Sequence, residues 1–258
     1  MAEAISRGHR IYYETLGFGP PLVLIPGLLM TTKRWELAGY PVLASRFQLI
    51  TLDTLGHGRS DKPQDAASYD RHGVAADVIA VMDAVGVQQA HVWGYSRGGG
   101  IAANVATLYP DRVRSLIMGG SLPNQAGRLL TNVNERVEAL RRDDWSAFWT
   151  SMGLTRDAQL EAALQAGTEA GAVAAIIEAS GQPDGFENDF AAMRDRLLVY
   201  AGSNDLGLSD PANVQALESR CNEIGARLEL LDGLNHAEAF QRSDLVMPFV
   251  RDFLRNVP

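Results

Sequence analysis

Short apolar runs alternate with longer amphipathic stretches along most of the chain. The runs predicted as strands are Leu22–Ile25, Gln48–Leu52, His91–Trp93, Val113–Met118, Leu197–Tyr200 and Leu228–Leu231. Several are apolar throughout, which is typical of parallel strands covered by helices on both faces. Arg10–Glu14 is interpreted as part of an antiparallel hairpin at the sheet edge. The pattern predicts an α/β fold with a mostly parallel central sheet and helices on both faces.

Helical spacing fills the intervals between these strands. Val74, Val78 and Met82 fall on one helical face, and Gly86 is suited to end that helix. The apolar positions of 245–254 predict a final helix that packs on the sheet.

Residues 121–193 break the alternation. This stretch has no convincing strand and is rich in Ala, Glu, Gln and Arg. We therefore predict a catalytic core formed by 1–120 and 194–258, with 121–193 inserted as a helical cap. Four large apolar residues of the cap either line a substrate pocket or simply pack at helical spacing: Trp145, Phe148, Trp149 and Met152.

Composition restricts the class of protein further. The chain has 258 residues, which suits one domain with an insertion, and 31 acidic against 23 basic side chains give a net charge of −8. Such a charge disfavours nucleic acids and anionic membranes as partners. Cys221 stands alone, so no intrachain disulfide is expected. With no apolar signal-peptide region and no run of ~20 apolar residues, we expect a cytoplasmic protein. Its oligomeric state is not predicted.

The sharpest local feature is Gly94-Tyr95-Ser96-Arg97-Gly98, between a predicted strand and a predicted helix. This is the G-x-S-x-G nucleophile elbow, which holds a serine exposed on a strained turn at a helix N-terminus. Glycine at positions 94 and 98 avoids Cβ clashes in so tight a turn. Ser96 is the predicted nucleophile.

A serine nucleophile requires a base, and the base requires an orienting acid. Only His236 follows the last predicted strand and precedes the last helix, whereas His57 lies in a glycine-rich turn and is interpreted as structural. Asp205 follows the strand Leu197–Tyr200, giving the chain order Ser, Asp, His. Asp210 and Asp232 are the rival acids, the first being suited to cap a helix.

An acyl-transfer enzyme also stabilises an oxyanion, typically with backbone N–H groups. The amide of Arg97, directly after the nucleophile, is one predicted donor. The amide of Leu28, in the loop after Leu22–Ile25, is the other.

Together these features resemble the α/β-hydrolase superfamily, and more narrowly its small esterase, enol-lactonase and cofactor-free haloperoxidase/perhydrolase group. The motifs that carry the resemblance are Ile25-Pro26-Gly27-Leu28, Asp53-Thr54-Leu55-Gly56-His57-Gly58-Arg59-Ser60, Gly94-Tyr95-Ser96-Arg97-Gly98, Asp205 and His236. The resemblance implies the α/β-hydrolase fold with a helical cap. It leaves the substrate open.

Three departures from relatives matter. Many have His-Gly where this chain has Pro26-Gly27, a change that keeps the amide of Leu28. Epoxide hydrolases and haloalkane dehalogenases use an aspartate nucleophile, so Ser96 argues against both, and 121–193 contains no tyrosine. Arg97 is a large cation beside the nucleophile, which either pairs with a neighbouring acid or meets an anionic group of the substrate.

The leading hypothesis is a serine hydrolase that cleaves a small-molecule carboxylic ester or lactone through an acyl-enzyme. Perhydrolysis, thioester hydrolysis and C–C bond hydrolysis use the same triad and stay open, as does a ligand-binding protein that has lost turnover. No metal or organic cofactor is expected, because the chain has no H-E-x-x-H, C-x-x-C or P-loop motif.

Overall fold

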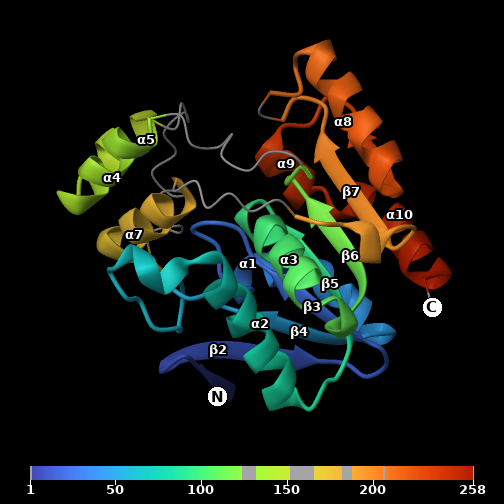
Figure 1. Cartoon of the computed structure of the whole chain (residues 1–258), viewed down its shortest axis with the longest axis horizontal. Helices are drawn as coiled ribbons and strands as arrows, with labels where there is room; N and C mark the ends of the chain where they lie inside the picture. Colours follow the sequence, from blue (N-terminus) through green and yellow to red (C-terminus); the bar gives the residue numbers. More distant parts are fainter. Residues whose placement is uncertain (1, 124–131, 152–165, 182–187, 206, 258) are drawn as a thin grey trace.

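The computed structural model describes residues 2–123, 132–151, 166–181, 188–205 and 207–257 (Figure 1). Within these ranges one eight-stranded sheet has the order β1-β2-β4-β3-β5-β6-β7-β8. Its strands are β1 (Ala2–Ser6), β2 (His9–Leu16), β3 (Pro21–Ile25), β4 (Gln48–Leu52), β5 (Ala90–Tyr95), β6 (Val113–Gly119), β7 (Leu197–Gly202) and β8 (Ala226–Leu231). β2 is antiparallel to β1 and β4, and the other neighbours are parallel. The predicted mostly parallel sheet is confirmed.

Helices connect most of the strands. The α-helices are α1 (Thr32–Leu37), α2 (Arg71–Val85), α3 (Arg97–Leu108), α4 (Val133–Arg141), α5 (Trp145–Ser151), α7 (Ala170–Gly181), α8 (Pro211–Ile224), α9 (His236–Gln241) and α10 (Ser243–Asn256). Short 3₁₀ turns are η1 (Tyr40–Ser45), η2 (Ala66–Tyr69), η3 (Pro110–Arg112) and η4 (Ala191–Met193). No helix in the described ranges is long and apolar enough to cross a membrane.

Both faces of the sheet are covered. Along β3, Val23 and Ile25 point into one hydrophobic cluster, and Leu22 and Leu24 point into another. Apolar residues of α2, α3 and α8 complete the first cluster, and those of α1, α9 and α10 complete the second. Because side chains alternate across a strand, burial of both faces requires apolar residues at successive positions, which explains the continuous apolar runs.

The N-terminal hairpin was only partly predicted. β2 extends the expected Arg10–Glu14 and pairs with β1 in the register Ala4 opposite Ile11. β1 itself forms the edge of the sheet, and it buries little more than Ala4 and Ser6. A strand with one half-covered face carries a weak apolar signal, so the sequence did not reveal it.

Helices α4, α5 and α7, between β6 and β7, lie together to one side of the sheet (Figure 1). α4 packs on both α5 and α7, while α7 packs on η2 of the core. Their apolar side chains form a third cluster that includes Phe148 and Trp149 and also Leu29 from the core. Phe190, near the end of the same insertion, is buried in the main cluster instead. The division into a core and a cap at 121–193 stays a prediction.

Candidate active site

Ser96 lies at the junction of β5 and α3, with backbone angles φ 54° and ψ −122°. A positive φ is costly for a residue with a Cβ atom and typically marks a functional turn. The turn is held by the Ser96 N–H, which donates to the Gly119 carbonyl of β6 at 2.7 Å. The strand therefore ends and the helix begins within one strained residue, as expected for a nucleophile elbow.

The two glycines of the elbow are required by close backbone approach. A Cβ atom at Gly94 would lie 1.9 Å from the carbonyl oxygen of Gly98. A Cβ atom at Gly98 would lie 2.2 Å from the carbonyl oxygen of Ile25, on β3. Since real Cβ atoms essentially never come so near, only glycine lets α3 start this close to the sheet.

Ser96, His236 and Asp205 form a continuous hydrogen-bonded chain. His236 Nε2 lies 2.9 Å from Ser96 Oγ, and His236 Nδ1 lies 2.9 Å from both carboxylate oxygens of Asp205. The carboxylate accepts from Nδ1–H, which leaves Nε2 as acceptor for the serine hydroxyl. The side chain of Asp205 is 8% exposed and that of His236 is 31% exposed. Asp205 is thus shielded from solvent while His236 remains accessible.

Asp205 and His236 come together because the loops after β7 and β8 touch. A Cβ atom at Gly202 would lie 2.0 Å from the carbonyl oxygen of Leu234. His236, predicted between the last strand and the last helix, is the first residue of α9, whose N-cap Asn235 forms a capping box with Glu238. The cap fixes where α9 begins, and with it the backbone of His236.

Two further contacts bear on the choice of acid and on the setting of the histidine. Asp210, the rival acid, accepts from the Ala212 N–H as the N-cap of α8. Tyr95 donates its hydroxyl to the backbone carbonyl of His236. This tyrosine was not singled out from the sequence, because its partner is 141 positions away and no local pattern links them.

The predicted oxyanion donors flank the serine. A Cβ atom at Gly27 would lie 3.1 Å from Ser96 Cβ, so the loop after β3 runs directly beside the nucleophile. Arg97 is the first residue of α3, where a helix leaves its N–H groups without intrahelical partners. Within the described part of the chain, neither the Leu28 nor the Arg97 N–H donates to a protein acceptor. Both amides are available to a ligand oxygen.

His57, interpreted from the sequence as structural, organises this loop, although the sequence did not reveal its partner. Its side chain is fully buried, and Nε2 accepts from the Leu29 N–H at 3.0 Å. Nδ1 lies 3.1 Å from Thr54 Oγ1 and 3.3 Å from the Leu55 carbonyl oxygen. Burial lowers the pKa of His57 to about 3, so the ring is neutral and stays an acceptor at ordinary pH. The residue after Leu28 is therefore anchored by a permanent hydrogen bond.

Asp53 connects the same two loops. Its Oδ1 accepts from the Thr32 N–H at 2.7 Å and its Oδ2 accepts from the Arg59 N–H at 2.9 Å. β3 and β4 are neighbours in the sheet, so the loops that follow them lie side by side. These contacts give the 53–60 turn a structural role, as the sequence predicted for His57.

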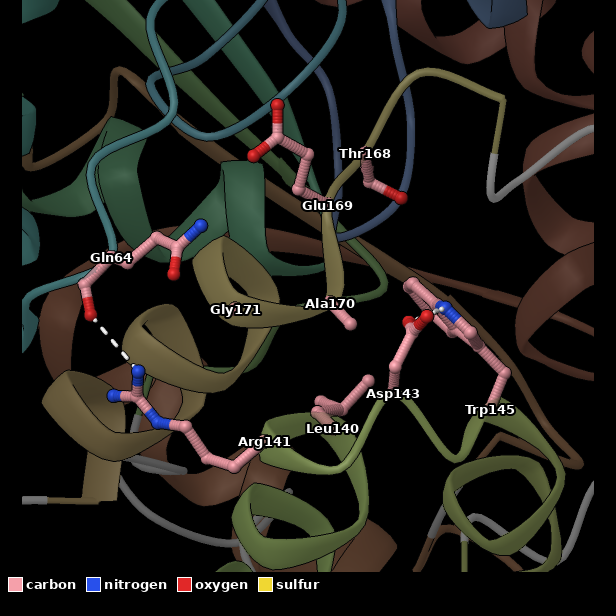
Figure 2. A pocket seen from close by; sticks show the side chains of 9 residues that line it. All are labelled: Gln64, Leu140, Arg141, Asp143, Trp145, Thr168, Glu169, Ala170 and Gly171. Carbon is pink, nitrogen blue, oxygen red and sulfur yellow. Dashed lines mark hydrogen bonds between the residues drawn. The ribbon is translucent and has the colours of Figure 1, made fainter.

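The residues predicted to line a substrate pocket have different environments. Phe148 and Trp149 are almost fully buried in the cluster that contains Leu29. Trp145 lines a groove of about 390 Å³ between α4 and α7, where its indole N–H donates to Asp143 at 3.0 Å (Figure 2). Met152 lies outside the described residues. The pocket-lining role of all four stays a prediction.

The groups available for a reaction at this site are therefore a serine, a histidine, a carboxylate and backbone amides. Across the described segments, no three His, Cys, Asp or Glu side chains gather in a way that would hold a metal ion.

Residues 20–237 match the family model described as alpha/beta hydrolase fold. The chain belongs to this family. The match extends from the start of β3 to just beyond His236, and so includes the elbow, the loop of Leu28, Asp205 and His236.

Relatives and solved structures agree with this assignment. The chain is 38% identical over 122 residues to 2-hydroxymuconate semialdehyde hydrolase of Pseudomonas sp. (strain CF600), covering 46% of this chain and 42% of that protein. It spans less than half the length of the curated relatives that are 38% or 39% identical to it. The enol-lactonase from Burkholderia xenovorans LB400 superimposes with a TM-score of 0.77 at 21% identity, over 99% of this chain and 100% of that one. Est816, an N-acyl homoserine lactone degrading enzyme, superimposes with a TM-score of 0.76 at 26% identity, over 98% of this chain and 100% of that one.

Proposed function

We propose that this protein is a serine hydrolase that cleaves a small-molecule carboxylic ester or lactone through an acyl-enzyme. The observation that carries the proposal is the hydrogen-bonded chain from Ser96 Oγ through His236 to Asp205, with 2.9 Å at each step. A serine hydroxyl is a weak nucleophile by itself, and a histidine within hydrogen-bond reach supplies the base that it needs.

In the first half-reaction Ser96 Oγ attacks the carbonyl carbon while His236 Nε2 takes the hydroxyl proton. The tetrahedral oxyanion accepts hydrogen bonds from the N–H groups of Leu28 and Arg97. Asp205 stabilises the imidazolium across Nδ1–H. Collapse of the intermediate breaks the ester C–O bond, and the leaving alkoxide receives the proton from His236.

In the second half-reaction a water molecule gives its proton to His236 and attacks the acyl carbon. Collapse of the second tetrahedral intermediate returns the proton to Ser96 Oγ and releases the carboxylic acid. For a lactone, the alcohol and the acid remain in one product molecule. Every proton taken is returned, so the triad needs no external acid, base or cofactor in this scheme.

The printed names of the relatives support the substrate class and one alternative. Two solved structures of the same fold are named for lactone cleavage, and at 26% identity Est816 adds some weight beyond the fold. 2-Hydroxymuconate semialdehyde hydrolase favours hydrolysis beside a ketone as the second candidate. That reaction breaks a C–C bond, which the same triad can serve.

The test compares wild type with Ser96→Ala on p-nitrophenyl esters of two to eight acyl carbons, and on N-acyl homoserine lactones by proton release. Wild-type turnover that falls to background in Ser96→Ala supports the proposal. The matched control is Ser115→Ala, because Ser115 also contacts a histidine, His91 Nδ1 at 2.8 Å, but lies on β6 away from the elbow. Folded wild type that cleaves neither class, or Ser96→Ala that keeps its rate, would refute it.

A further inference from the structure

The guanidinium of Arg97 has no partner in the described structure. Its Nη1 atom has neither solvent contact nor an acceptor, and no described residue forms a hydrogen bond or an ion pair with the side chain. Two other arginines with partly buried side chains are paired, Arg7 with Asp77 at 3.0 Å and Arg112 with Asp83 at 2.6 Å. The ion pair considered from the sequence is therefore absent from the described residues.

The groups near Arg97 are already engaged. Asp77 and Tyr69 are the groups whose charge acts on Arg97. The Asp77 carboxylate accepts three hydrogen bonds from Arg7, at 3.0 to 3.2 Å, and the Tyr69 hydroxyl donates to the Pro63 carbonyl at 2.7 Å. The neutral His57 uses Nε2 to accept from Leu29. None of these three groups accepts a hydrogen bond from the Arg97 guanidinium.

Arg97 as a whole is partly exposed, but its Nη1 atom is buried without an acceptor, which is unfavourable because that donor loses hydration and gains no hydrogen bond. Burial lowers the pKa of Arg97 to about 10, which still leaves the side chain protonated at neutral pH. Folding thus holds a positive charge in a place where the described chain does not neutralise it. An anion from outside the chain would complete the site.

The position of Arg97 ties that anion to the reaction. Its backbone follows Ser96 directly, and its charge acts on His57, which anchors the loop that runs beside Ser96. Its neighbours also reach the insertion: the His57 backbone bridges to Thr168, and a Cβ atom at Gly56 would lie 2.7 Å from Ile176 of α7. Arg97 therefore stands near the boundary between the sheet and the helices inserted after β6.

We infer that the Arg97 side chain binds a carboxylate of the substrate, so that the ester or lactone carries a separate anionic group. A planar guanidinium matches a carboxylate through two parallel hydrogen bonds. One cation suits a singly charged group, and the Lys62 ammonium donates to the Gly58 and Ser60 carbonyls. This inference rests on the proposed function for the reaction, but its binding step can be tested without turnover.

The kinetic test uses two pairs of esters that differ in charge. Mono-p-nitrophenyl adipate is compared with p-nitrophenyl hexanoate, which places the carboxylate in the acyl part. 4-Acetoxybenzoate is compared with 4-acetoxytoluene, which places it in the leaving group. We expect wild type to prefer the charged member of at least one pair in kcat/KM. The preference should fall by about 10- to 100-fold in Arg97→Gln, since a charged hydrogen bond is lost.

The matched control is Arg112→Gln, which removes one positive charge from η3, before β6 and at the opposite end of α3 from Ser96. Arg112→Gln should keep the wild-type preference for the charged ester. Arg97→Lys should show part of the preference that Arg97→Gln loses, because lysine returns the positive charge but not the two parallel N–H donors of the guanidinium. A wild type that prefers neither charged ester, or an Arg97→Gln variant that keeps the preference, would overturn the inference.

The binding test separates this inference from the proposed function. Adipate is titrated calorimetrically into Ser96→Ala with and without Arg97→Gln, and loss of binding in the double variant is expected. If wild type cleaves no ester or lactone while this loss is seen, the proposed function fails and the anion site stands. Adipate that fails to bind, or binds equally to both variants, would overturn the anion site.

Thermal unfolding tests whether Arg97 has only a structural role. Removing a cation whose buried Nη1 donor has no acceptor should leave Tm unchanged or raise it. A fall in Tm of Arg97→Gln well beyond that of Arg112→Gln would show that the guanidinium has a stabilising protein partner, and it would overturn the inference.

Discussion

His57 and His236 occupy equivalent places in the sheet and have opposite properties. Each follows a parallel strand at its carboxyl end, β4 for His57 and β8 for His236, and each contacts the surroundings of Ser96. The His236 side chain is 31% exposed and faces a carboxylate, whereas His57 is fully buried among a hydroxyl and backbone groups. Position in the fold alone therefore does not make a histidine a base.

The physical difference lies in what stabilises the protonated ring. Around His57, desolvation disfavours the imidazolium, and the charges of Arg97 and Lys62 disfavour it further, which holds its pKa at about 3. Around His236, Asp205 offers a counter-charge at 2.9 Å. The first ring is suited to be a fixed acceptor, and the second is suited to exchange a proton with Ser96.

The largest expected loss of activity follows from removing the side chain of His236, the proposed base. His236→Ala should lower kcat by roughly 10⁴- to 10⁶-fold, because members of a triad act as a unit. Tm should change little, since the side chain is partly exposed. The measurement is kcat on the best p-nitrophenyl ester together with thermal unfolding. A loss of less than tenfold would show that another group serves as base.

The next largest loss of activity is expected from changing Asp205, the proposed orienting acid. Asp205→Asn keeps the shape but removes the charge that stabilises the imidazolium, and a loss of roughly 10⁴-fold in kcat is expected. Asp210→Asn is the matched control, because Asp210 caps α8 and takes no part in the hydrogen-bonded chain. Equal losses in the two variants would contradict the assignment of Asp205.

A smaller loss should follow removal of the acceptor at His57. His57→Leu leaves the Leu29 N–H without its partner and frees the loop that carries the Leu28 amide, so kcat should fall by about 10- to 100-fold. KM should change less, because the oxyanion forms only in the transition state. His57→Gln offers a side-chain oxygen to Leu29 and should recover part of kcat. A rate equal to wild type in His57→Leu would show that the loop holds its place without this bond.

The smallest effect should appear in stability against pH. A histidine has a pKa of about 6.5 in an unfolded chain, and in the folded protein that of His57 is about 3. The unfolded state therefore binds more protons between these values, and stability is lost as pH falls from 6.5 toward 3. His57→Gln should remove roughly 2 kcal/mol of the loss in unfolding free energy between pH 7 and pH 4.5.

Urea unfolding of both proteins at several pH values measures this difference. The carboxyl groups that titrate in the same range are common to wild type and variant, so they cancel in the comparison. Parallel curves for the two proteins would mean that His57 is protonated in the native state at mildly acidic pH.

The sequence by itself determined the fold class, the elbow and the order of the candidate triad. Gln48–Leu52 was predicted with its observed bounds, and the elbow followed from Gly94, Ser96 and Gly98. These features depend on residues that are close in the sequence. The periodicity of apolar residues indicates which faces of an element are covered, and glycine indicates where the backbone approaches another segment closely. Strand β1 was not predicted, because a half-buried edge strand lacks such an apolar pattern.

Only the tertiary structure decided which distant residues contact one another around Ser96. The bond from Leu29 to His57, the bond from Tyr95 to His236 and the lack of a partner for Arg97 all depend on which loops meet at the edge of the sheet. Strand order and helix packing set those meetings, and no local pattern encodes them. Arg97 shows this most clearly, because the sequence allowed either a protein acid or a substrate anion as its partner. Folding brought Asp77 near it but gave that carboxylate to Arg7.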